Sequence, residues 1–156
     1  MEKFPITIEG YKNLEAELKN LKSNERPAIS KKISEAREHG DLSENAEYHA
    51  ARERQSFIEG KIMELEDKMA RADVIDVSKL SGKKIKFGAL VGLIDDETDE
   101  KVSYRIVGEY EADISKNLVS VMSPLARALI SKEEGDNIEF TTPKGSKAYY
   151  IDSVEY

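Results

Sequence analysis

The 156-residue sequence contains no cysteine and no tryptophan. The lack of cysteine excludes disulfides, thiolate nucleophiles and cysteine-ligated zinc or iron–sulfur centres. No run approaches the roughly 18 apolar residues of a membrane helix, and the N-terminal residues MEKFPITIEG lack the basic and apolar regions of a secretory signal. We therefore expect a cytoplasmic protein that has no membrane contact.

Aromatic residues are also scarce, at 7%, whereas charged residues make up 35% and hydrophobic residues 39%. This composition suits a modest core combined with a charged, exposed helical part. The net charge is −7, and acidic residues exceed basic ones on both sides of Leu80. Neither half is therefore a basic nucleic-acid-binding module. Any contact with nucleic acid must be local, or must occur inside a partner that supplies the affinity.

Apolar residues in the first half recur at spacings of three and four, the period of an amphipathic helix. In the first stretch they are Tyr11, Leu14, Leu18, Leu21, Ala28, Ile29, Ile33 and Ala36. Pro27 interrupts this stretch, so we expect a local irregularity there, with the preceding residue pushed towards extended geometry. Gly40 is expected to end the helix. A second helix is expected from near Asp41 to beyond Ala72, with heptad spacing from Ile58 onward.

Short β-rich runs separated by glycine, aspartate and serine fill the second half. The candidate strands are residues 84–87, 89–94, 102–107, 138–141 and 149–154. The acidic segment 95–100 is expected to be a hairpin loop, and residues 142–146 a turn. Ser123 and Pro124 are residue types that cap and begin a short helix. This half is therefore expected to be a small, mainly antiparallel sheet with one short helix.

Together the two patterns predict an α+β fold in two domains. We place an N-terminal antiparallel α-helical coiled-coil hairpin at residues 1–77, with its tip near residues 40–45. The globular β-sheet domain follows at residues 78–156. Each hairpin arm of roughly 30 residues would be about 45 Å long, at about 1.5 Å per residue.

The expected tip reads REHGDLSENAEY, in which Asp41 and Glu44 directly follow Gly40. One interpretation is a capping box, in which Asp41 accepts hydrogen bonds from backbone N–H groups at a helix start. The other is a shared hard cation, because Mg²⁺ prefers oxygen ligands and keeps several waters. Two carboxylates alone would hold Mg²⁺ weakly, so a partner or a substrate phosphate would have to complete the site. The residues leave both interpretations open.

Other chemistry has less support in the sequence. His39 and His49 are the only histidines and lie on opposite sides of the turn; a zinc pair is the alternative to two ordinary polar residues. We find no glycine-rich phosphate loop, Walker lysine motif or serine nucleophile elbow. By themselves Arg37, Arg52 and Arg54 are ordinary helix charges, but beside the carboxylates they could contact a polyanion.

Two stretches of the sequence resemble the bacterial Gre transcript-cleavage factors. Residues 36–53, AREHGDLSENAEYHAARE, are similar to the tip of that family, and residues 123–130, SPLARALI, to its globular-domain signature. The likeness extends essentially end to end. Leu42, Glu47 and residues 49–53 are similar to the GreA branch rather than to the more basic GreB branch.

The resemblance implies an FKBP-like C-terminal domain that docks on RNA polymerase while the hairpin enters the secondary channel. Asp41 and Glu44 would then be the catalytic and metal-binding residues, holding Mg²⁺ jointly with the polymerase. They would stimulate cleavage of the nascent RNA 3′ end in backtracked complexes. The chain would support the polymerase's own hydrolysis and would not be an enzyme by itself.

The same resemblance gives further residues a role. Arg37 and Arg52 match positions near the tip that contact extruded RNA, and Ser123 and Pro124 match the region that docks on the polymerase. Ser43 stands where many GreA sequences have a basic residue, although both acidic positions are filled. We expect a monomer. The alternatives are a non-catalytic regulator of the secondary channel and a helical-hairpin adaptor unrelated to transcription.

Overall fold

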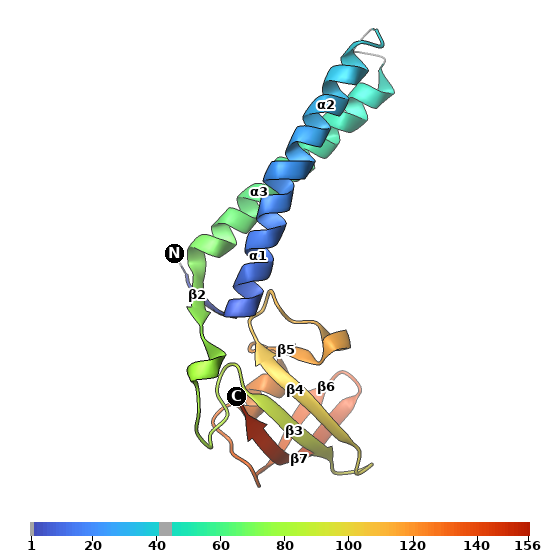
Figure 1. Ribbon diagram of the computed structural model, residues 1–156. Helices are drawn as coiled ribbons and strands as arrows, with labels where there is room; N and C mark the ends of the chain where they lie inside the picture. Colours follow the sequence, from blue (N-terminus) through green and yellow to red (C-terminus); the bar gives the residue numbers. More distant parts are fainter. Residues whose placement is uncertain (1, 41–44) are drawn as a thin grey trace. The chain divides into compact units, whose positions relative to one another are not determined.

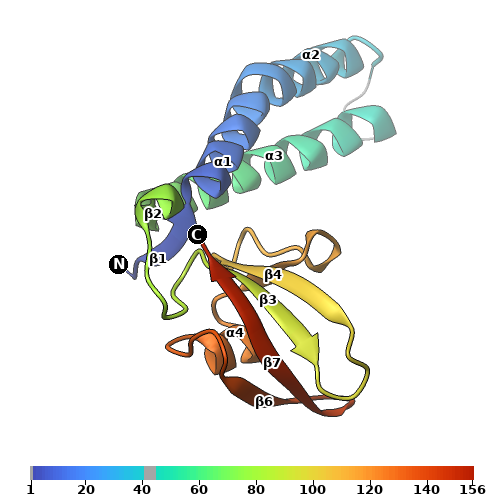
Figure 2. The same ribbon diagram turned by 60° about the horizontal axis from the view of Figure 1, so that its bottom comes forward.

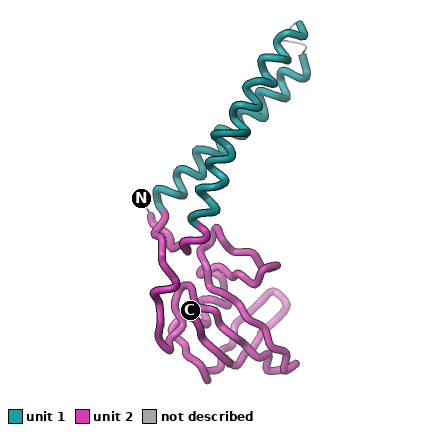
Figure 3. Tube along the Cα trace, viewed as in Figure 1, with its two compact units in different colours: residues 1, 11–71 teal, residues 2–10, 72–156 magenta. Residues whose placement is uncertain are grey.

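The computed structural model describes residues 2–40 and 45–156 (Figure 1). Its elements are β1 (Phe4–Thr7), α1 (Ile8–Asn20), a π-helical turn (Leu21–Glu25), α2 (Arg26–Arg37), α3 (Ala46–Arg71), β2 (Ala72–Ile75), β3 (Leu90–Asp95), β4 (Lys101–Val107), β5 (Leu118–Ser120), α4 (Pro124–Leu129), β6 (Asn137–Thr142) and β7 (Gly145–Glu155). They form two compact units (Figure 3). The hairpin unit contains residues 11–71, and the sheet unit contains residues 2–10 and 72–156.

The hairpin unit pairs α2 with α3, which run side by side in Figure 1. The buried residues of its seam are Leu14, Leu21, Ile29, Ile33, Ala36, Ala51, Ile58, Ile62 and Leu65. Ile58 is 1% exposed and its neighbour Phe57 is 59% exposed, so the buried stripe on α3 contains the isoleucine and not the phenylalanine. Burying each large aliphatic side chain contributes about 1.5–3 kcal/mol. None of the helices in the described parts is long and apolar enough to cross a membrane.

The irregularity predicted at Pro27 is confirmed as the π-helical turn that immediately precedes α2. The expected extended geometry of the preceding residue is wrong, because Arg26 is α-helical (φ −61°, ψ −50°). Proline lacks an N–H group and its ring clashes with the carbonyl four residues earlier, so a wider turn accommodates it within a helix. Arg26 donates two hydrogen bonds across the hairpin to the Glu59 carboxylate, at 2.8 and 2.9 Å. The irregular turn is therefore held to α3 by a bidentate ion pair.

The second helix of the hairpin differs from the prediction at its end. We expected it to pass Ala72, which is wrong, because α3 ends at Arg71. The next four residues form β2, which pairs in parallel with β1 and places Phe4 opposite Ala72. This pairing joins segments far apart in the sequence and is not visible in a helical period. The start that we predicted near Asp41 lies outside the described residues; within them, α3 begins at Ala46.

The sheet unit contains a five-stranded sheet in the order β5-β4-β3-β7-β6. Figure 2 shows β4, β3, β7 and β6 of this sheet. All neighbours are antiparallel except β4 and β5. The acidic segment 96–100 connects β3 to β4, and Pro143–Lys144 connect β6 to β7. Gly145 follows this tight turn with a φ of +119°, a conformation that glycine adopts without strain. The predicted hairpin loop and turn are therefore confirmed.

The core of the sheet unit lies between the sheet and α4. Its buried residues are Ile85, Ala89, Val91, Leu93, Ile106, Val119, Leu125, Ala126, Leu129, Ile138, Tyr149 and Ile151. Ala126 and Leu129 of α4 are completely buried. The predicted α+β fold class, a helical hairpin followed by a mainly antiparallel sheet with one short helix, is confirmed.

Two details of this unit differ from the predicted strands. Residues 84–87 do not form a strand: the Ile85 N–H donates to the carbonyl of Lys132 in a loop, at 2.8 Å. The hydroxyl of Tyr156 donates to the carbonyl of Lys84, at 2.6 Å. Backbone groups that would pair in a sheet are thus bonded to a loop and a side chain. The short strand β5, parallel to β4, was not predicted.

Candidate functional site

The candidate site is the end of the hairpin, formed by the last turn of α2 and the first turns of α3. The N–H of His39 donates to the Ala36 carbonyl at 3.2 Å and closes the final turn of α2. Gly40 follows with a φ of +121°. Such a positive φ is readily adopted by glycine. However, α2 ends at Arg37 with Glu38 as its C-cap, so the prediction that Gly40 itself ends the helix is wrong by three residues.

Asn45 joins the two helices at this end. Its Oδ1 accepts a hydrogen bond from the N–H of Tyr48 at 3.0 Å, so it is the N-cap of α3. Its Nδ2 donates to the carbonyl of Ala36 in α2, at 2.5 Å. Sequence reasoning missed this residue, although an asparagine directly before a helix is a recognised capping signal.

The two acidic residues on which the prediction depends, Asp41 and Glu44, lie outside the described residues. Both the capping-box and the metal-site interpretations therefore stay predictions. Within residues 2–40 and 45–156, no group of three or more histidine, aspartate or glutamate side chains could hold a metal ion.

The basic residues of the hairpin end differ in their surroundings. Arg37 is the last residue of α2, Arg52 lies in the second turn of α3, and both are exposed. The guanidinium of Arg54 lies 5.0 Å from the centre of the Phe57 ring and 4.0 Å from the Glu25 carboxylate. Arg54 thus takes part in structural contacts within the hairpin.

A groove of about 450 Å³ follows the seam between α2 and α3. Its lining residues are Ile29, Lys32, Glu35, Ala36, His39, Glu47, Ala50, Ala51 and Arg54. Buried Ile29, Ala36 and Ala51 supply an apolar floor, while the rim carries charges of both signs. The rim therefore gives the groove no preference for an anion or a cation.

The segment Ser123–Ile130 is largely structural. The Oγ of Ser123 accepts a hydrogen bond from the N–H of Ala126 at 3.2 Å, and Pro124 is the first residue of α4, as predicted. Pro124 is exposed, and the adjacent Met122 is 55% exposed. A partner would therefore meet these two side chains, whereas the Ser123 hydroxyl already holds the helix cap.

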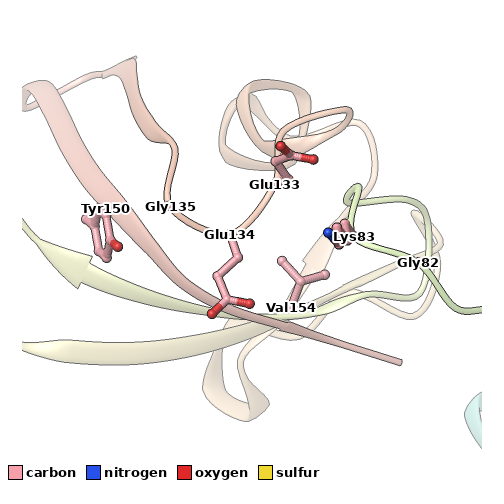
Figure 4. A pocket seen from close by; sticks show the side chains of 7 residues that line it. All are labelled: Gly82, Lys83, Glu133, Glu134, Gly135, Tyr150 and Val154. Atoms are coloured by element: carbon pink, nitrogen blue, oxygen red, sulfur yellow. The ribbon is translucent and has the colours of Figure 1, made fainter.

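A second groove, of about 500 Å³, lies on the sheet unit (Figure 4). It is lined by Gly82, Lys83, Glu133, Glu134, Gly135, Tyr150 and Val154. Figure 4 shows Tyr150 at one end and Lys83 at the other, with Glu134 between them. Its charges are also of both signs, and none of the residues predicted for the site lines it.

Several shifted pKa values accompany structural contacts. The Ser78 hydroxyl lowers the pKa of Asp76, which caps a short 3₁₀ turn. In the hairpin, the hydrogen bond from Arg26 to Glu59 raises the pKa of Arg26, and Lys68 lowers the pKa of Glu64. These shifts belong to a turn cap and to ion pairs, not to a pair of groups set up for acid–base catalysis.

Family models match both parts of the chain. Residues 4–74 match the model "Transcription elongation factor, N-terminal", and residues 80–156 match "Transcription elongation factor, GreA/GreB, C-term". The class of protein that carries this hairpin and sheet unit is thus the transcription elongation factors.

Proteins of similar sequence identify the branch of the transcription elongation factors to which the chain is related. Transcription elongation factor GreA of Rickettsia canadensis is 67% identical over 154 residues, which cover 99% of this chain and 95% of that protein. The GreA of Phenylobacterium zucineum is 65% identical over 156 residues, covering 100% and 99%. The chain belongs to the GreA/GreB family, in its GreA branch. The family resemblance of the tip and of residues 123–130 is confirmed.

Solved structures that resemble the chain include two of the transcription factor Gfh1. One is 27% identical, with a TM-score of 0.47 and complete coverage of both chains. The other, from Thermus aquaticus, is also 27% identical and completely covered, with a TM-score of 0.45.

Proposed function

We propose that the chain binds bacterial RNA polymerase, inserts the hairpin tip into the secondary channel and stimulates Mg²⁺-dependent cleavage of the nascent RNA 3′ end in backtracked or arrested complexes. The observation that carries the proposal is the pair of acidic residues, Asp41 and Glu44, in the tip sequence of a GreA-branch chain. The bracing of that hairpin end by Asn45 supports it, because a tip that acts at a reaction centre must be presented by ordered helices.

The donor chemistry of the two residues fits the proposed metal. Carboxylate oxygens are the hard ligands that Mg²⁺ prefers, but two of them leave most of its coordination to other groups. Among the described residues, no cluster of three or more histidine, aspartate or glutamate side chains could hold the ion by itself. Asp41 and Glu44 would therefore hold Mg²⁺ jointly with the polymerase. When bound there, Mg²⁺ would be the second ion of a two-metal hydrolysis, in which one ion activates the attacking water and the other stabilises the leaving oxygen.

The remaining predicted residues have supporting roles in the proposal. Arg37 and Arg52, one exposed on each arm, would contact the phosphates of extruded RNA. Pro124, with its exposed neighbour Met122, would contact the polymerase, and Ser123 would contribute chiefly by capping the helix that carries them. We propose that the protein acts in the cytoplasm as a monomer, and that the hydrolysis itself belongs to the polymerase.

The test replaces both tip carboxylates, Asp41→Asn and Glu44→Gln, and measures RNA cleavage in a purified backtracked elongation complex. The double variant should still bind the polymerase but lose the stimulated cleavage. The matched control, Glu38→Gln with Glu47→Gln, removes two exposed carboxylates from the same hairpin end and should keep cleavage.

Each other result has a definite meaning. Full cleavage with the Asp41/Glu44 variant would overturn the role of the carboxylates. Binding of the wild type without any stimulated cleavage would leave the non-catalytic channel regulator, and failure to bind core polymerase at low salt would leave an adaptor unrelated to transcription. RNA hydrolysis by the chain without polymerase would contradict its proposed role as a non-enzyme.

A further inference from the structure

The carboxylate of Glu111 accepts several hydrogen bonds close to the start of α1. Its Oε2 accepts from the N–H of Thr7 at 3.0 Å and from the N–H of Gly108 at 2.8 Å, and the Thr7 hydroxyl bonds to its Oε1. Thr7 is 8% exposed. The N–H of Glu111 donates to the Gly108 carbonyl at 3.1 Å, so residues 108–111 form a closed turn around this contact.

Thr7 links this carboxylate to the first turn of α1. It precedes Ile8, the first residue of α1, and its Oγ1 accepts a hydrogen bond from the N–H of Gly10 at 3.0 Å. A threonine in this position is a helix N-cap. A carboxylate near a helix N-terminus is also stabilised by the helix dipole. Glu111 therefore supports the first turn of α1 both directly and through the cap.

The contact between the start of α1 and the turn 108–111 is closely packed. A Cβ at Gly10 would collide with the Glu111 carboxylate, and a Cβ at Gly108 would collide with the carbonyl of Pro5 in β1. The rings of Phe4 and Tyr110 also meet edge to face, with centroids 4.9 Å apart. The turn 108–111 thus packs on β1 by backbone and ring contacts as well as by the carboxylate.

All of these residues belong to the sheet unit, which includes residues 2–10. The helix they begin, α1, continues through residues 11–20 of the hairpin unit without a break. We propose that Glu111 is a positioning residue: it holds the first turn of α1 on the turn 108–111, so that docking of the sheet unit on its partner is transmitted to the helix. The functional half of this inference rests on the proposed function.

The test uses full-length protein and two readouts. The variant is Glu111→Gln, and the matched control is Glu109→Gln, an exposed glutamate of the same turn. The first readout is amide hydrogen exchange measured by NMR without polymerase. Glu111→Gln should raise the exchange rates of the Thr7 and Gly108 amides by about tenfold, because these hydrogen bonds to a charged group are weakened. The control should leave them unchanged.

The second readout is stimulated RNA cleavage as a function of protein concentration. Glu111→Gln should lower the maximal cleavage rate while the half-saturating concentration stays that of the wild type. A raised half-saturating concentration with an unchanged maximal rate would overturn the positioning role, because Glu111 would then be a docking residue. Unchanged amide exchange would overturn it as well.

Further variants separate this proposal from other failures. Thr7→Ser keeps the hydroxyl and should behave as the wild type, whereas Thr7→Val removes the cap and should accelerate exchange of the Gly10 amide. Slow exchange at Ile106 and Ile151 in the core shows that each variant is folded. A wild type that stimulates no cleavage would refute the proposed function, while the exchange readout would still decide whether Glu111 holds this contact.

Discussion

At the scale of single residues, one side chain at the hairpin end both caps α3 and contacts α2. Asn45 accepts the hydrogen bond from Tyr48 that caps α3, and it donates to Ala36 at the end of α2. The described start of α3, at Ala46, is thus capped by a residue that the sequence prediction did not name.

Replacing Asn45 should reveal both of its bonds. Asn45→Ala should lower stability by about 0.5–2 kcal/mol, the usual loss on removing an N-cap. Asn45→Asp keeps an oxygen for the N–H of Tyr48 but cannot donate to Ala36, so it should fall between the alanine variant and the wild type. Thermal unfolding followed by helical circular dichroism measures the difference. Equal stability of all three proteins would show that the two hydrogen bonds of Asn45 do not stabilise the hairpin end.

Asp95 gives a prediction that depends on pH. Its carboxylate accepts from the N–H of Glu97 at 2.8 Å and of Thr98 at 3.3 Å, and Lys147 lies 3.4 Å away. These contacts, the bond from Glu97 first, lower the pKa of Asp95. A lowered folded-state pKa stabilises the fold above the unfolded pKa of about 4, and this stabilisation is lost as pH falls through the folded value.

Asp95→Asn should therefore lower the unfolding midpoint at neutral pH and flatten its decline below about pH 4. The matched control is Asp96→Asn, which changes an exposed neighbour in the same loop and should preserve the acid dependence. Denaturant unfolding at a series of pH values measures both effects. If the stability of Asp95→Asn declined below about pH 4 as steeply as that of the wild type, this carboxylate would not contribute to the acid dependence of stability.

At the scale of elements, the spacing of apolar residues predicts a helix or strand correctly where the same residues also form its contacts with the neighbouring element. The helical period indicates both hairpin arms, because their buried stripes face each other. It fails at Arg71, where β2 forms only because β1 lies beside it. The strand pattern fails at residues 84–87, where buried Ile85 between exposed lysines has the alternation of a strand. The N–H of Ile85 bonds to a loop carbonyl and the carbonyl of Lys84 to the Tyr156 hydroxyl, which no alternation of residues could reveal.

Gly60 offers a test at this scale. It lies within α3, and a Cβ added there would meet nothing within 4 Å. Glycine in an exposed helix costs about 0.5–1 kcal/mol relative to alanine, so Gly60→Ala should stabilise the hairpin by about that amount. Gly40→Ala is the matched control: it also has open space, but its φ of +121° should make alanine destabilising. Urea unfolding compares the two, and a destabilised Gly60→Ala would contradict the open helix face.

At the scale of the whole molecule, the candidate site could be predicted only because its sequence resembles a family. Physical reasoning left two interpretations of Asp41 and Glu44 open, a helix cap and a pair of metal ligands, since both roles place carboxylates at a helix start. It could not find Asn45 or Glu111 as structural joints, because their partners Ala36 and Thr7 are fixed by tertiary contacts. The metal site that we propose also depends on groups that belong to another molecule.

That incompleteness makes a prediction for the isolated protein and for its complex. Because two carboxylates hold Mg²⁺ weakly, titration calorimetry of the free chain should show no tight binding. In the backtracked complex, the wild type should lower the Mg²⁺ concentration that gives half-maximal cleavage, and Asp41→Asn should raise it again. Glu38→Gln, a neighbouring carboxylate, should leave it at the wild-type value. Tight Mg²⁺ binding by the free chain that Asp41→Asn abolishes would show instead that the chain forms the site without its partner.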